Sequence, residues 1–184
     1  MTNQYRDAAH RPAGWWFIGI ARIVIGVMWF QQTLWKLPPH YDGLRFWLGQ
    51  AAQFPKYAWY KHLLDSVVLP HFEVFAFQAW LGETFIAVSL VFGLFARLGG
   101  LLSGLMAINL LVAMSGVPHE WYWTYLFIAV LGFIFCFTRA GRYLGVDQAL
   151  APRIEAAASQ GSGIARIARE IGRASCRERV YVLV

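Results

Sequence analysis

The chain has 184 residues, of which 58% are hydrophobic and 17% aromatic, while only 14% are charged. A soluble globular domain carries about 25% charged residues, so this composition excludes an ordinary soluble protein and indicates an integral membrane protein. The two cysteines exclude a disulfide scaffold, and the aliphatic and aromatic content excludes a disordered chain. The net charge of +6 does not indicate nucleic-acid binding, because the basic residues are scattered at the edges of apolar runs, where lipid headgroups lie.

Four apolar stretches are long enough to cross a bilayer, which takes about 20 helical residues. They cover residues 14–37, 72–95, 98–117 and 121–138. In the third stretch, Gly100 and Gly104 have the spacing that lets helix backbones approach closely in lipid. The sequence therefore predicts an all-α fold, an integral membrane four-helix bundle.

The link between the first two spans, residues 40–69, is too aromatic for a free loop. Apolar residues share one helical face over residues 44–51, Pro55 interrupts the pattern, and it resumes over residues 57–68. The pattern predicts two short helices lying in the membrane interface. They act either as simple interfacial anchors or as a lid folded over the bundle.

Arginines are concentrated on one side of the predicted bundle. If the chain crosses the membrane four times, the arginines on that side are Arg6, Arg11, Arg97, Arg139, Arg142 and Arg153. The positive-inside rule then predicts that both termini lie in the cytoplasm. We expect residues 1–13 to be a cytoplasmic amino tail, residues 14–150 the membrane domain and residues 151–169 a flexible tail. Residues 170–184 resemble a translated sequencing adapter, and we expect them to be non-native.

Two ionisable residues lie within predicted spans, where an unpaired charge is costly and therefore points to function. Glu83 lies near the middle of the second span, and Arg22 lies about 12 Å inside the first. If the two helices are antiparallel, the Cα atoms of these residues differ in height along the membrane normal by roughly 6 Å, which the two long side chains can span. The sequence therefore predicts a buried Arg22–Glu83 pair. Either the pair is catalytic, with Glu83 as proton acceptor, or it only locks the two helices together.

Further polar side chains in and beside the spans suggest a polar seam through the bundle. These candidate cofactor-binding residues are Gln31, Gln32, Lys36, Gln78 and Asn109. Such a seam would hydrogen-bond a quinone carbonyl or relay a proton. The alternative for each amide is hydrogen bonding between helices.

Cysteine and histidine positions exclude other chemistries. Outside residues 170–184, Cys136 is the single cysteine, which excludes thiol–disulfide exchange by this chain alone. No two histidines have ligand spacing on a predicted helix, so we predict no metal site. No nucleotide-binding or hydrolase motif occurs either.

Three segments carry a family resemblance: ARIVIGVMWFQQTLWKL at residues 21–37, VLPHFEVFAFQAWLGETFIAVSLVFGLFARLGGLLSGLM at 68–106, and AGRYLGVDQAL at 140–150. Through them, about residues 15–150 resemble the DoxX superfamily of small bacterial and archaeal membrane proteins. The most similar branch is DoxD, the small subunit of thiosulfate:quinone oxidoreductase. The resemblance implies functional or structural roles for Arg22, Lys36, Glu83, Gly141, Arg142 and Asp147.

The resemblance implies a protein of the prokaryotic cytoplasmic membrane that helps transfer electrons from thiosulfate to quinone. Because the sequence shows no redox centre of its own, such a role needs a bound quinone, another bound cofactor, or a soluble or membrane redox subunit as a partner; a homo-oligomer is a further expectation. The alternative is a non-catalytic membrane anchor or assembly protein. A small-solute transporter has less support, because four spans offer little internal symmetry and no pair of broken helices.

Overall fold

The computed structural model describes residues 15–138 and 140–150, and every regular element in them is a helix. The helices are α2 (Trp15–Leu34), α3 (Asp42–Gln53), α4 (Ala58–Leu63), α5 (Phe72–Phe92), α6 (Ala96–Met114) and α7 (Trp123–Phe137). A π-helical turn, Leu64–Val68, continues α4, and a short 3₁₀ turn, Ala140–Arg142, follows α7. The predicted tails, residues 1–13, 151–169 and 170–184, lie outside the described residues.

Three helices, α2, α5 and α6, are long and apolar enough to cross a membrane, which supports the prediction of a membrane protein. The fourth predicted span falls short of that length: α7 has 15 residues and ends where Thr138 adopts extended backbone. Large apolar side chains are exposed on the outer surface, among them Phe17, Val74 and Phe127, each more than half accessible. Such a surface is compatible with contact with lipid.

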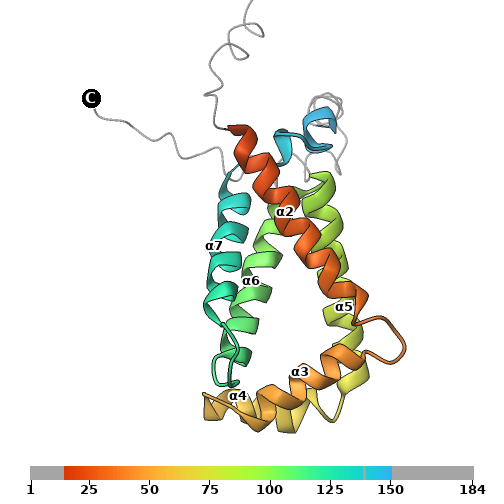
Figure 1. Ribbon diagram of the computed structural model, residues 1–184. Coiled ribbons are helices and arrows are strands. Elements are labelled where there is room, and N and C mark those ends of the chain that lie inside the picture. The colour runs from red at the N-terminus through yellow and green to blue at the C-terminus, as the bar shows by residue number, and fades with distance from the viewer. Residues whose placement is uncertain (1–14, 139, 151–184) are drawn as a thin grey trace, which may run out of the picture.

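The long helices pack mainly as two pairs, α2 with α5 and α6 with α7, and α5 also contacts α6 (Figure 1). Glycines bring α6 and α7 together: a Cβ on Gly132 would lie 2.6 Å from the backbone nitrogen of Gly104 and 2.8 Å from the carbonyl oxygen of Gly100. The pair of small residues identified in the sequence thus lies at a backbone contact.

The α2–α5 contact fixes the register of these two helices. Gly26 lies against the other helix, because a Cβ there would come within 2.7 Å of the backbone nitrogen of Val91 and 3.0 Å of the carbonyl carbon of Leu90. No larger residue fits at this contact without moving backbone. Each residue before or after Gly26 in α2 therefore lies at a defined height along the axis of α5.

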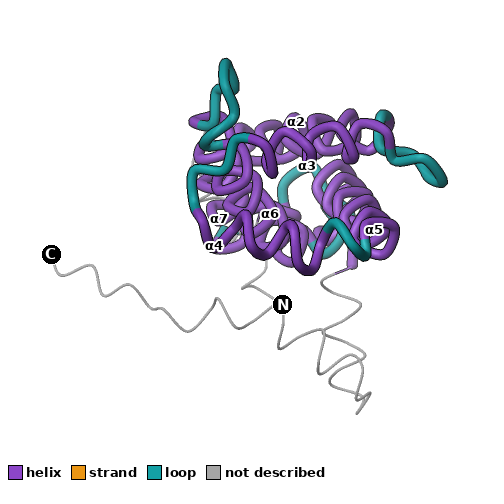
Figure 2. Tube along the Cα trace, turned by 90° about the horizontal axis from the view of Figure 1, so that it is seen from below, coloured by secondary structure: helices purple, strands orange, loops and turns teal. Residues whose placement is uncertain are grey.

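The link between α2 and α5 contains the short helices predicted for it, and they cross one end of the bundle (Figures 1 and 2). Tyr60 and Leu64 are buried here against Ala113 and Met114 at the end of α6. The segment α3–α4 therefore packs against the end of α6.

Candidate functional site

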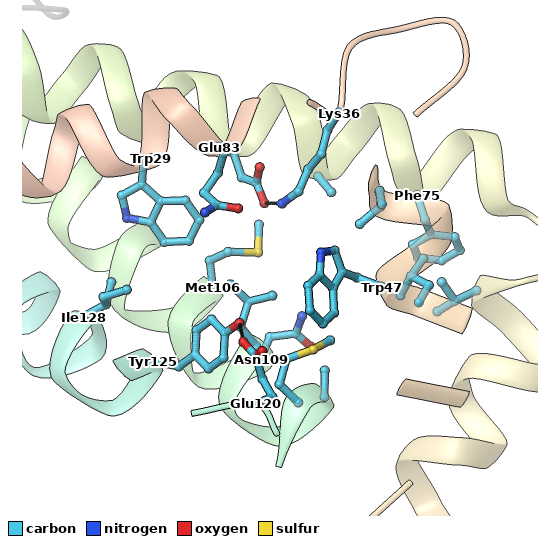
Figure 3. Close-up of a pocket in the computed structure, with 18 of the residues that line it drawn as sticks. Trp29, Lys36, Trp47, Phe75, Glu83, Met106, Asn109, Glu120, Tyr125 and Ile128 are labelled. Atoms are coloured by element: carbon cyan, nitrogen blue, oxygen red, sulfur yellow. Dashed lines mark hydrogen bonds and ion pairs between the residues drawn. The ribbon is translucent and has the colours of Figure 1, made fainter. Parts of the chain in front are cut away.

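A cavity of about 440 Å³ lies where α2, α5, α6 and α7 meet the α3–α4 segment (Figure 3). Its wall is mainly aromatic and aliphatic, and its aromatic members are Trp29, Trp35, Trp47, Tyr60, Phe75 and Tyr125. The indole of Trp29 is fixed in place, because its Nε1 donates a hydrogen bond of 2.8 Å to the Ser103 hydroxyl. Concave sites with apolar walls and a few fixed polar groups are typical of small-molecule binding.

One side of the cavity carries a buried ion pair between Lys36 and Glu83. Lys36 Nζ donates to Glu83 Oε1 at 2.7 Å, and the two side chains are only 5% and 2% exposed. Glu83 lies in the middle of α5, and Lys36 lies two residues after the end of α2. The second carboxylate oxygen, Oε2, is buried and accepts no hydrogen bond from the described residues. A buried pair with an unused acceptor is expensive in an apolar wall, which favours a functional role.

The opposite side of the cavity carries two tyrosine hydrogen bonds (Figure 3). The Tyr60 hydroxyl donates to Asn109 Oδ1 at 3.2 Å, and the Tyr125 hydroxyl donates to Glu120 Oε1 at 2.7 Å. Burial raises the pKa of Tyr60, which lies outside the long helices, and the bond to Asn109 lowers it by less. The Tyr60 hydroxyl is therefore protonated at neutral pH.

The predicted ion pair between Arg22 and Glu83 is wrong, because Glu83 pairs with Lys36 instead. The register set by Gly26 explains the error. Counted from that contact, Arg22 lies at the level of the end of α5, roughly 16 Å along the axis from Glu83. The prediction compared the approximate ends of the apolar stretches, which do not define how antiparallel helices are aligned.

Arg22 is fully buried away from the cavity and binds backbone carbonyl oxygens. Its guanidinium donates to the carbonyls of Leu90, Val91, Tyr143 and Leu144. These belong to the end of α5 and to the segment after α7. The side chain thus links α2 to the end of α5 and to the segment after α7 at one end of the fold, as its five donors allow.

Asp147 and Gly141 lie at the same end as Arg22. The Asp147 carboxylate accepts hydrogen bonds from the backbone nitrogens of Phe95, at 2.9 Å, and Ala96, at 3.1 Å, and so caps the start of α6. Gly141 packs so closely against Asp147 that a Cβ would clash with the carboxylate. Both residues organise the backbone here, while the side chain of Arg142 lies outside the described part.

The predicted polar seam is only partly assembled. Gln32 and Asn109 line the cavity with Lys36 and Glu83. Gln31 and Gln78 do not line it. Neighbouring helical residues point about 100° apart, so Gln31 turns away from Gln32, and Gln78 lies about 140° around the helix from Glu83.

Among the cavity residues that were not identified as site residues from the sequence, four have side chains that form hydrogen bonds: Trp29, Tyr60, Glu120 and Tyr125. Tyr60 and Glu120 belong to links between spans, and aromatic residues near span ends are typical of interfacial belts. One signal was available, since Glu120 is a carboxylate in a very short link between apolar stretches. Its pairing with Tyr125 depends on the folding of that link.

The polar groups of the cavity define what it can do chemically. Lys36 and the Asn109 amide donate hydrogen bonds, Glu83 and Glu120 accept them, and the carboxylates can also hold a proton. Within residues 15–138 and 140–150, no group of three or more His, Cys, Asp or Glu is placed to hold a metal ion. The arrangement suits an uncharged, ring-shaped ligand that carries oxygen atoms.

Comparison with known proteins adds no relative. No family model matches the sequence, and searches of the curated proteins and of the solved structures find no match.

Proposed function

We propose that the chain is an integral membrane subunit of a quinone-linked oxidoreductase and that the cavity binds the quinone ring. The observation that carries this proposal is the buried Lys36–Glu83 pair in an aromatic wall. An ion pair that only joined two helices would not need an adjoining cavity. It would also not need a carboxylate oxygen without a partner among the described residues.

The residues present fit a quinone. A volume of about 440 Å³ lies within the range of ligand cavities, about 300–1,000 Å³, and aromatic walls suit a flat ring. The Lys36 ammonium has three donors and uses one on Glu83, so the others are available to a carbonyl oxygen. Glu83 Oε2 is available to a hydroxyl donor.

A bound quinone supplies two-electron, two-proton chemistry that the side chains themselves do not. Lys36 would orient one oxygen of the ring, and Glu83 would hold a proton at Oε2. The apolar wall would exclude water around both groups. Electrons would reach the quinone from a partner subunit with a redox centre. The resemblance to the DoxD branch of the DoxX superfamily implies thiosulfate as the electron donor to that subunit.

We also infer that α7 is the fourth span of a four-helix bundle. Its 15 residues rise about 22 Å, and the aromatic residues Trp121 and Tyr122 before it suit the membrane interface. Four spans place both termini on the cytoplasmic side of a prokaryotic membrane. The α3–α4 segment and the cavity then lie toward the opposite face.

The first experiment is purification of the full chain with native lipid, followed by extraction and identification of bound quinone. Quinone binding is then measured in lipid nanodiscs for the wild type and the Lys36→Met/Glu83→Leu double variant. The double variant is preferred because either single change leaves one buried charge unpaired. We expect at least a tenfold loss of affinity, with the helical circular dichroism unchanged.

The matched control is the Lys61→Met/Asp65→Asn double variant. This pair has the same 2.7 Å separation, but it is exposed and does not line the cavity. Its quinone affinity should equal that of the wild type. If the wild-type protein binds no quinone, or if both double variants bind it equally well, the oxidoreductase proposal fails and the anchor or assembly role is favoured.

A further inference from the structure

The cavity has polar groups on two opposite sides, and this restricts the kind of ring it can hold. Resting on the quinone site proposed above, we infer that the ligand carries one oxygen at each end of the ring, as a para-quinone or its hydroquinone does. Lys36 and Glu83 bind one end. Asn109 and Glu120 bind the other, from the far side of the cavity (Figure 3).

Asn109 is oriented to donate at the second end. Its Oδ1 accepts the Tyr60 hydroxyl at 3.2 Å, which fixes which way the amide is turned. The Nδ2 group then has two hydrogens that the described residues do not engage. Because Asn109 lines the cavity, these hydrogens are available to a carbonyl oxygen of the ligand.

Glu120 provides the acceptor at the same end. Its Oε1 is engaged by the Tyr125 hydroxyl at 2.7 Å, which holds the carboxylate against the cavity wall. Its Oε2 receives no hydrogen bond within the part of the chain that the structure describes. This oxygen can accept from a ligand hydroxyl.

Each end therefore combines a donor with a carboxylate: Lys36 with Glu83, and Asn109 with Glu120. A carbonyl oxygen accepts from the donor, and a hydroxyl donates to the carboxylate, so the same site accommodates the oxidised and the reduced ring. The two ends come from different helix pairs, α2–α5 and α6–α7 with the link before α7. An ortho-quinone, whose oxygens are adjacent, would reach one end only.

The test compares three bicyclic probes of similar size by equilibrium binding to the full chain in nanodiscs. They are 2,3-dimethyl-1,4-naphthoquinone, 3,4-dimethyl-1,2-naphthoquinone and 2,3-dimethyl-1-tetralone, which has a single carbonyl. Wild-type protein should bind the 1,4-quinone at least tenfold more tightly than either of the others. The Asn109→Leu variant should lose that advantage and bind the tetralone as the wild type does, because Lys36 still holds its one oxygen.

Glu120→Gln provides an independent variant that keeps the shape of the side chain. It should weaken the hydroquinone more than the quinone, because only the hydroquinone needs an acceptor at this end. Asp65→Asn, at an exposed carboxylate outside the cavity, is the control for loss of a charge.

The outcomes separate this inference from the function it rests on. Equal binding of the two quinones, or no effect of Asn109→Leu on the 1,4-quinone, would overturn recognition at two ends while leaving the quinone site in place. An equal loss for all three probes in Asn109→Leu would overturn it too. If the wild type binds none of the probes, both the inference and the proposed function fail.

Discussion

The energetic coupling between Lys36 and Glu83 is the most direct measure of how the site is built. The proposed perturbation is a double-mutant cycle of Lys36→Met, Glu83→Leu and the two changes together. Each single change leaves one charge without its partner in a wall where the side chains are 5% and 2% exposed. The double change leaves an apolar pair of similar volume.

The expected magnitudes follow from burial. Removing one partner of a buried, hydrogen-bonded ion pair costs about 3–5 kcal/mol, whereas replacing both partners by apolar residues is often neutral or stabilising. Each single variant should therefore lose about 3 kcal/mol or more of unfolding free energy. The double variant should be more stable than either single variant, which requires a coupling of at least about 3 kcal/mol.

The assay is unfolding in mixed micelles, followed by tryptophan fluorescence. The control cycle uses Lys61 and Asp65, which are also 2.7 Å apart but are 47% and 46% exposed. An exposed pair at i, i+4 couples by only about 0.3–0.5 kcal/mol. Comparing the two cycles separates the effect of burial from that of distance.

Additive effects would refute the reasoning. If the Lys36 and Glu83 single changes each cost less than about 1 kcal/mol and sum to the double change, the pair is solvated rather than buried. The cavity would then hold water around two independent charges, and the site would need another explanation.

Three further predictions use the same unfolding assay. Arg22→Met should cost about 3 kcal/mol or more, because buried carbonyls lose their donor. Gly132→Val should prevent α6 and α7 from packing and abolish folding, whereas Gly49→Ala, where a Cβ meets nothing within 4 Å, should be neutral or slightly stabilising. Because burial raises the pKa of Tyr60, the folded state keeps its proton longer than the unfolded state, so stability should fall above about pH 10. Tyr60→Phe should reduce that fall; an unchanged pH profile would contradict the assignment.

Helix position was largely predictable, because the length and flanks of an apolar run are local properties. The apolar stretches contain α2, α5 and α7, the third stretch overlaps α6 but begins two residues after it, and Pro55 separates α3 from α4 as expected. The ends were less predictable. The fourth stretch was predicted to reach residue 138, but extended backbone at Thr138 ends α7 before it.

The candidate site was predictable in its residue types and only partly in its members. A carboxylate in the middle of an apolar span marked Glu83, and a lysine at a span end marked Lys36, because both are costly in lipid. Gln78 was included on nearness in sequence, although its position on the helix turns it away from the cavity. Tyr60 and Glu120 reach the cavity only because the links fold back over the bundle.

The sequence by itself determined an all-helical membrane protein with charged residues inside its apolar segments, because hydrophobicity and helical periodicity are local properties of the sequence. The tertiary structure decided which charges meet. Gly26 sets the register of α2 against α5. In that register Glu83 pairs with Lys36, and Arg22 donates hydrogen bonds to backbone carbonyls. A contact between two helices depends on how far one slides along the other, and no periodicity within either helix specifies that distance.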